Sequence, residues 1–147
     1  MPKLDLASIT PVCRTGYPAP FDRQMAGRWQ QRIGATLGLD HLGATLVTLK
    51  PGGWSSQRHW HFGEDELVVM LSGEAVLVED GGETVLAPGD ICVWKAGVDN
   101  GHCLQNRSEA DCAFLALSAG EDSGGSYSDI DMKWGPGGYT RKDGTPY

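Results

Sequence analysis

Residues 53–73, GWSSQRHWHFGEDELVVMLSG, place two histidines and a carboxylate just before a run of apolar residues. His59 and His61 are separated by one residue, and residues i and i+2 of a β-strand project from the same face, roughly 6.5–7 Å apart. Residues 62–65 include a turn-forming glycine, so Glu66 can return on a neighbouring strand toward the same point. A further ring nitrogen is available downstream at His102. These two residue types, in this spacing, suit a divalent first-row metal, and we predict a metal site at His59, His61, Glu66 and His102.

The composition bounds the class of protein. A chain of 147 residues is long enough for one domain with a sizeable core. A formal charge of −7 without a Lys/Arg cluster disfavours nucleic-acid binding. The first residues lack the apolar core of a signal peptide, and no apolar run is long enough to span a membrane, so we expect a cytoplasmic protein. In that compartment its four cysteines, which form no CxxC pair, are expected to be reduced: Cys13, Cys92, Cys103 and Cys112.

Short apolar segments separated by glycine-rich turns predict an all-β domain. The strands are expected at 28–33, 44–49, 55–61, 66–71, 74–79, 83–86, 91–94, 102–106 and 112–118. About this many short strands make a sandwich or a closed barrel. We therefore divide the chain into an irregular N-terminal arm (1–27), a barrel domain (28–118) and a C-terminal tail (119–147). The tail carries six large apolar residues, which predicts that it packs on the barrel or on a partner subunit.

Two motifs in this chain resemble those of the cupin superfamily. The first is formed by Gly53, His59, His61, Glu66 and Gly73, and the second by Gly89, Gly97, His102 and Asn106. The likeness covers about residues 42–118 and extends to small single-domain bacterial cupins of unassigned activity. It implies a double-stranded β-helix, or jelly-roll barrel, and it supports the four metal ligands named above.

The second motif departs from the family pattern in two ways. Lys95 stands where proline is usual, and the loop from Gly97 to His102 is two residues longer. Near the first motif, Glu64 and Asp65 are rival carboxylates to Glu66. The resemblance and the start of the apolar strand favour Glu66, while Glu64 is interpreted as a solvated turn residue.

Several neighbours of the predicted ligands share their strand faces. Gln57 lies on the face of His59 and His61, where it could contact a substrate, hydrogen-bond a ligand or simply be a satisfied polar group. Val68, Met70 and Leu104 share faces with Glu66 and His102, so they line the pocket or belong to the core. Cys103 should point to the opposite face. His41 lies outside both motifs and is expected to have no role at the site.

The function implied by this pattern belongs to one of two classes. Three imidazoles and one carboxylate leave open positions on an octahedral metal, which suits an enzyme acting on a small organic molecule. Iron would suggest a dioxygenase, whereas manganese, zinc or nickel would suit isomerase, lyase or hydrolytic chemistry. The alternative is a non-catalytic cupin that binds or senses a small, sugar-like molecule. In either class we expect a homodimer, because small barrels leave sheet faces and edges to be covered.

Overall fold

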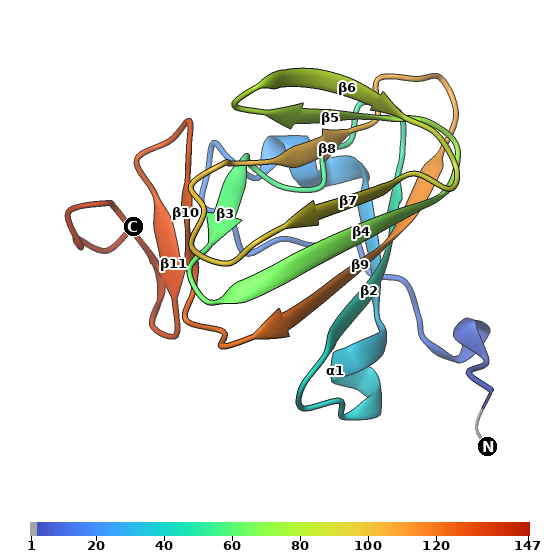
Figure 1. Cartoon of the computed structure of the whole chain (residues 1–147), viewed down its shortest axis with the longest axis horizontal. Helices are drawn as coiled ribbons and strands as arrows, with labels where there is room; N and C mark the ends of the chain where they lie inside the picture. The colour runs from blue at the N-terminus through green and yellow to red at the C-terminus, as the bar shows by residue number, and fades with distance from the viewer. Residues whose placement is uncertain (1–2) are drawn as a thin grey trace.

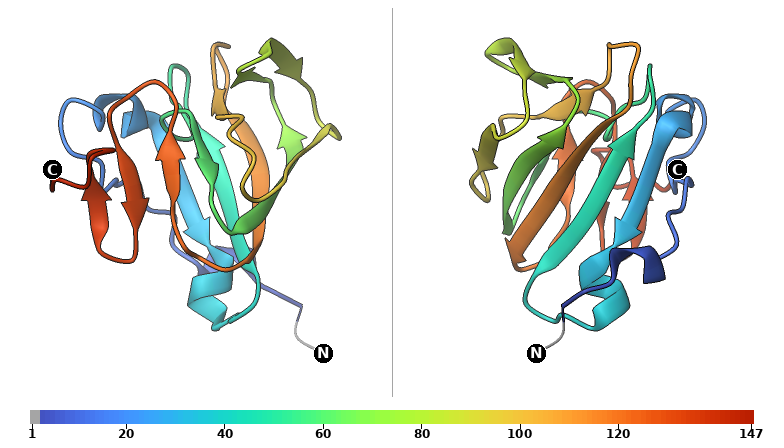
Figure 2. Two further views of the ribbon diagram at one scale, coloured as in Figure 1. Left: turned by 60° about the vertical axis from the view of Figure 1, so that its left-hand side comes forward. Right: turned by 90° about the vertical axis from the view of Figure 1, so that its right-hand side faces the viewer.

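The computed structural model describes residues 3–147, which form a barrel of antiparallel sheets (Figures 1 and 2). The largest sheet has the order β1-β2-β9-β4-β7. Its strands are β1 (Arg28–Arg32), β2 (Gly43–Leu49), β9 (Cys112–Gly120), β4 (Glu64–Ser72) and β7 (Ile91–Trp94). Two 3₁₀ turns, η1 (Leu6–Ser8) and η2 (Arg23–Gly27), lie in the arm, and a short helix, α1 (Ile33–Leu37), joins β1 to β2.

Two smaller sheets make the opposite wall of the barrel. One is β6-β5-β8, formed by β6 (Gly82–Leu86), β5 (Ala75–Glu79) and β8 (Cys103–Gln105). The other is β12-β11-β10-β3, formed by β12 (Gly138–Thr140), β11 (Lys133–Gly135), β10 (Gly125–Tyr127) and β3 (His59–His61). Backbone hydrogen bonds of 3.1 and 2.9 Å between His59 and His102 join the two sheets. The predicted all-β jelly-roll fold is confirmed.

The main core lies between these walls. Its buried apolar side chains come from both, with Val68, Met70 and Phe114 from the large sheet and Leu77 and Leu104 from the small one. The inward positions follow from register, since Gln30 pairs with Val47, Val47 with Phe114, and Phe114 with Met70. Residues directly opposite one another in a sheet project from the same face. These paired positions therefore lead from the polar side chain of Gln30 on β1 to the apolar side chains of the core.

The segment before the paired histidines is not the strand that the sequence predicted. Only His59–His61 of the expected strand at 55–61 pairs as one, and residues 55–58 form a series of bends. Side chains from distant parts of the chain form hydrogen bonds with the backbone groups of this segment. The Arg28 guanidinium donates to the Ser55 carbonyl (2.7 Å), and the Gln57 N–H donates to the Tyr17 hydroxyl (3.3 Å). Backbone groups satisfied in this way need no neighbouring strand.

The tail packs on the barrel through strand pairing. β10 pairs with β3, opposing Gly125 to His61 and Tyr127 to His59, and β11 and β12 extend the sheet outward (Figure 1). A second apolar cluster forms where the tail meets the arm; its buried members are Tyr17, Met25, Tyr127 and Met132. The arm also covers the free edge of β1, where Val12 and Gln30 exchange two backbone hydrogen bonds.

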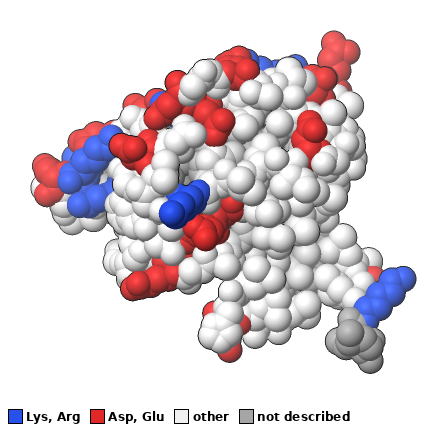
Figure 3. Space-filling view, in the orientation of Figure 1, with Lys and Arg blue, Asp and Glu red and all other residues white. Residues whose placement is uncertain are grey.

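One face of the molecule is mostly acidic or uncharged. On the face drawn in Figure 3, red acidic groups outnumber blue basic ones, and a broad area carries neither. All four cysteines are unpaired. Within residues 3–147, no helix is long and apolar enough to cross a membrane.

Candidate metal centre

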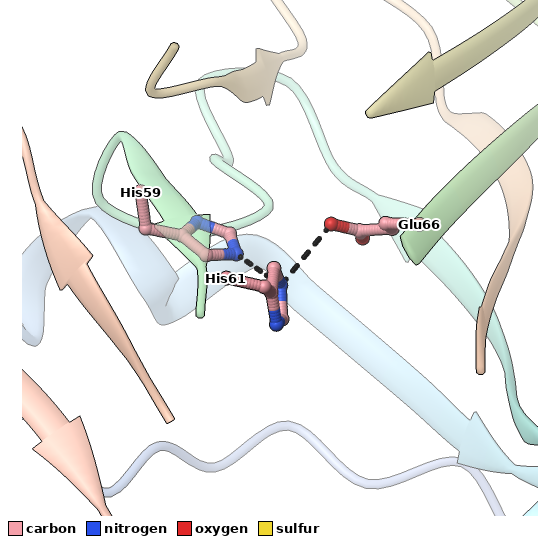
Figure 4. Close-up of side chains that lie close together, drawn as sticks. All are labelled: His59, His61 and Glu66. Carbon is pink, nitrogen blue, oxygen red and sulfur yellow. Dashed lines mark hydrogen bonds and ion pairs between the residues drawn. The ribbon is translucent and has the colours of Figure 1, made fainter. Parts of the chain in front are cut away.

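Two strands that follow each other in the sequence but belong to different sheets bring two imidazoles and a carboxylate together at one end of the barrel. His59 and His61 project from the same face of β3, and Glu66 projects toward them from β4 (Figure 4). The Nε2 atoms of the two histidines lie 3.2 Å apart, and Nε2 of His61 lies 3.2 Å from Glu66 Oε2. One donor atom from each of these three residues falls within 4.8 Å of the other two.

His102 lies beside the same carboxylate, although it is not one of the three residues whose donor atoms all lie within 4.8 Å of one another. Its Nε2 lies 2.8 Å from Glu66 Oε2, and its side chain is 3% exposed. The indole of Trp94 stacks on its imidazole, with ring centroids 3.9 Å apart and planes 12° apart. Trp94 is itself held by a 2.6 Å hydrogen bond from its Nε1 to Glu79. We call His59, His61, Glu66 and His102 the donor group.

The hydrogen bonds around the donor group suit metal binding. Nδ1 of His59 lies 3.1 Å from the Gln57 carbonyl oxygen, which assigns the ring proton to Nδ1 and leaves the Nε2 lone pair free. Two ligands about 2.1 Å from one metal and at right angles to each other have donor atoms about 3.0 Å apart. The observed separations of 2.8 and 3.2 Å match that value. The residues present therefore fit a divalent metal.

Burial and neighbouring charges set the protonation of these groups. Burial, and next the proximity of His102, lower the pKa of His59 to about 3, so its imidazole is neutral at neutral pH. Burial opposes the charged form of Glu66, but hydrogen bonds from His102 and His61 outweigh it and lower the pKa of this carboxyl well below its usual range. Burial also opposes the charged form of His61, yet Glu66 and Glu64 together raise its pKa. The neutral imidazole of His59 beside the ionised Glu66 is the form that binds a cation, whereas His61, whose pKa is raised, would release a proton when a metal binds.

The other residues singled out from the sequence fall in different places. Val68 and Leu104 line the cavity next to the donor group, whereas Met70 is 1% exposed in the apolar core and does not line it. The side chain of Gln57 turns away and donates to the Phe21 carbonyl oxygen (3.1 Å) and to Gln24 Oε1 (3.2 Å). Only its backbone carbonyl contacts His59. Cys103 is buried outside the cavity, and His41 is exposed.

Glu64 is not the solvated turn residue that the sequence suggested. It begins β4, so it shares a face with Glu66, and its side chain is only 18% exposed. Its Oε2 lies 3.3 Å from His61 Nδ1, and its Oε1 accepts a 3.0 Å hydrogen bond from Ser118. Glu64 and Glu66 thus flank opposite nitrogens of one imidazole. A predicted strand that began at Glu64 instead of Glu66 would have placed both carboxylates on one face.

The cavity has walls that the sequence analysis did not identify. Its volume is about 330 Å³, and besides the donor group it is lined by Arg28, Gln30 and Arg32 of β1, and by Tyr17, Tyr127 and Trp134 of the arm and tail. The rings of His59 and Trp134 have centroids 5.4 Å apart, in an edge-to-face arrangement. The alternation of Arg28, Gln30 and Arg32 along a predicted strand was the available signal, because it places three polar side chains on one face.

Comparison with proteins of known structure finds this architecture elsewhere. A protein of Silicibacter pomeroyi, described as a sugar phosphate isomerase from a cupin superfamily, is 42% identical. The match covers 99% of this chain and 96% of that one, with a TM-score of 0.92. The polyketide cyclase RemF of Streptomyces resistomycificus is 18% identical, with 88% and 87% of the two chains covered and a TM-score of 0.69, which shows the fold alone.

Sequence comparison gives a concordant result. The oxalate-binding protein of Thermotoga maritima is 34% identical over 67 residues, which are 46% of this chain and 54% of that protein. The chain thus spans about half the length of this curated relative. Residues 45–118 match the family model Cupin_2, described as a cupin domain, and this segment is half of the chain. With the jelly-roll barrel and the His/His/Glu arrangement already in place, the match shows that the chain belongs to the cupin family.

Proposed function

We propose that this protein is a metal-dependent isomerase of small phosphorylated sugars. One observation carries the proposal: the 42% identity extends over 99% of the chain to a structure described as a sugar phosphate isomerase, so it includes the arm and the tail that wall the cavity. The cavity itself supports it. A donor group suited to a metal lines the cavity, and so do arginines on β1, the edge strand of the large sheet that also carries Glu66.

The donor group would hold the metal, and its residue types suit iron, manganese, zinc or nickel. A metal bound there would polarise a substrate carbonyl, so that the neighbouring C–H becomes more acidic. One backbone carbonyl and two neighbouring side chains position the donor group. The Gln57 carbonyl fixes the ring of His59, Glu64 faces Nδ1 of His61, and Trp94 holds His102 by stacking.

Aromatic side chains from the tail limit the access of water to this end of the cavity. Tyr127 is 4% exposed, and its ring centroid lies 5.1 Å from that of Trp134. Both rings lie beside His59, at 6.0 and 5.4 Å between centroids. Apolar walls beside a charged site strengthen its electrostatic interactions.

A second candidate function is the binding of a small dicarboxylate without turnover. The observation that favours it is the 34% identity to the oxalate-binding protein, which spans 67 residues. This match is shorter than the one that supports an isomerase. It also corresponds to the non-catalytic class that the sequence analysis left open.

The two candidates are separated by a turnover assay combined with metal analysis. The protein is loaded in turn with Fe²⁺, Mn²⁺, Zn²⁺ and Ni²⁺ and incubated with a panel of aldose and ketose phosphates in D₂O. Isomerisation by proton transfer is expected to interconvert the two sugars and to place solvent deuterium on the carbon next to the carbonyl, both of which NMR detects. Oxalate binding without any turnover of the panel would favour the second candidate.

A matched pair of histidine variants connects turnover to the donor group. His61→Ala removes one imidazole of the donor group, and His41→Ala removes an exposed imidazole outside it. We expect His61→Ala to lose both metal and turnover and His41→Ala to keep both. Turnover that survives in His61→Ala without metal would overturn the proposal.

A further inference from the structure

A row of polar side chains on β1 faces the cavity from the edge of the large sheet. Arg28, Gln30 and Arg32 alternate along the strand and all line the cavity that contains the donor group. The intervening Gln31 points the other way and donates to the carbonyl oxygens of Leu6 and Ile9, at 3.0 and 2.6 Å. The row therefore belongs to the interior face of the barrel.

The same row lines a second cavity, of about 440 Å³, on the side of the arm. Tyr17, Arg28, Gln30 and Arg32 border both cavities, and Arg14 of the arm adds a third guanidinium to the second one. The two cavities thus meet at the β1 row. A ligand at this junction contacts arginine on one side and can extend toward the donor group on the other.

These arginines have no carboxylate partners within the described part of the chain. Arg14, Arg28 and Arg32 have no carboxylate oxygen within 4 Å, whereas Arg58 pairs with Asp129 and Asp80 and Arg107 pairs with Glu83. In a chain of formal charge −7, carboxylates are abundant. Three guanidinium groups left without them around one cavity create a local positive potential.

The environment of Arg28 is energetically unfavourable in the absence of a ligand. Its Nη1 donates to the Ser55 carbonyl oxygen, but its Nε is buried without any hydrogen-bond partner within residues 3–147. Burial, together with the like charge of Arg32, lowers the pKa of the Arg28 guanidinium. A half-buried cation with a fully buried, unused donor atom and no carboxylate partner is destabilising. An anionic ligand would supply both the missing acceptor and the missing charge.

We propose that Arg28 and Arg32, with Arg14 at the arm side, bind the phosphate group of the substrate. Guanidinium groups hold phosphate oxygens through charge-assisted, often paired hydrogen bonds, and Gln30 adds an amide donor between them. β1 and β4 are separated by three strand spacings, which is about 14 Å between backbones. Side chains from both strands shorten this gap to a length that a small sugar phosphate can bridge.

This inference deepens the proposed function and takes its substrate class from it, but phosphate binding can be tested without turnover. The probe is inorganic phosphate, titrated by calorimetry and ³¹P NMR into the full-length protein after metal has been stripped with a chelator. Without metal, the donor group holds no metal ion to which phosphate could bind. We expect saturable binding by the wild type and a loss of about 10–100-fold in affinity in Arg32→Gln, as for one charge-assisted contact.

Three further variants make the result specific. Arg28→Gln should weaken phosphate binding in the same way, and Arg28→Lys should recover part of it by restoring the charge. Because Arg28 also holds the Ser55 backbone, Arg32→Gln, at an exposed side chain, is the variant that least disturbs the fold. Arg107→Gln removes a surface arginine outside both cavities and should bind phosphate like the wild type.

The outcomes separate this inference from the proposed function. Phosphate binding that depends on Arg28 and Arg32 supports the anion site even if no sugar phosphate is turned over. Failure of the wild type to bind phosphate, or equal binding by Arg32→Gln and the wild type, overturns the anion site even if turnover is found. Where turnover is found, Arg32→Gln should raise KM for the phosphorylated sugar more than it lowers kcat.

Discussion

Replacing each of two neighbouring glutamates tests the assignment of the donor group most directly. Glu64 and Glu66 are two residues apart on one face of β4, and both contact His61. Glu66 lies on the Nε2 side, 3.2 Å from that atom and 2.8 Å from His102 Nε2. Glu64 lies on the Nδ1 side, 3.3 Å away. The two alanine variants therefore remove the same chemical group from opposite sides of one ring.

The expected magnitudes follow from these positions. Loss of a partner that only orients a metal ligand typically costs about 10–100-fold in metal affinity, and this range is expected for Glu64→Ala. Glu66→Ala removes a donor atom itself. A metal ion bound by the three remaining imidazoles would then lack its nearest negative charge. We expect a loss of more than about 100-fold, beyond the range for an orienting partner.

The measurement is a competition titration of Zn²⁺ and Mn²⁺ against a chelator of known affinity, with folding of each variant checked by circular dichroism. If Glu64→Ala loses the metal and Glu66→Ala keeps it, the metal lies on the Nδ1 side of His61, and the assignment of Glu66 as the ligand is wrong. If neither substitution weakens binding, no carboxylate of β4 is a ligand.

Four further outcomes are expected. Met132→Ala should lower the free energy of unfolding by about 2–5 kcal/mol in denaturant titration, because Met132 is fully buried where tail and arm meet. Hydrogen bonds from Arg58 lower the pKa of Asp129 below its usual 3.8, so this ion pair stabilises the fold above pH 3.8. The stabilisation is lost as the pH falls through the lowered pKa, so the Tm values of wild type and Asp129→Asn should converge there. Burial raises the pKa of Cys103 to about 11, so iodoacetamide at neutral pH should label Cys13 and spare Cys103 in the folded protein, as peptide mass spectrometry can check. Light scattering should give a dimer of about twice 15.8 kDa, and a monomer mass across micromolar concentrations would refute this.

Local patterns in the sequence were sufficient to predict the barrel and the close approach of His59, His61 and Glu66. Strand alternation alone places His59 and His61 on one face, and the resemblance to cupins, now confirmed, selected Glu66 and His102. Each of these inferences depends on spacings of a few residues. Their metal-binding role remains a prediction that the structure makes geometrically reasonable.

Contacts between distant segments could not be read from such spacings. The bends at residues 55–58 depend on Arg28 and Tyr17, which lie 27 and 40 residues from their partners. The pairing of β10 with β3 joins segments more than 60 residues apart, and the apolar residues of the tail predict only that it packs on the barrel or on a partner. Glu64 was misplaced for a different reason, because the glycine before it suggested that the turn extends further than it does.

The cavity is assembled from parts of the chain that can diverge separately. The donor group lies between His59 and His102, whereas Arg28 precedes it and Trp134 follows it. A fragment limited to residues 45–118 would keep every donor atom and lose both the arginine row and the aromatic wall. Substitutions in the arm, β1 or the tail can therefore change which molecule enters while the donor atoms stay in place. The atoms that would hold a metal and the atoms that would choose its ligand are therefore encoded in separate stretches of this chain.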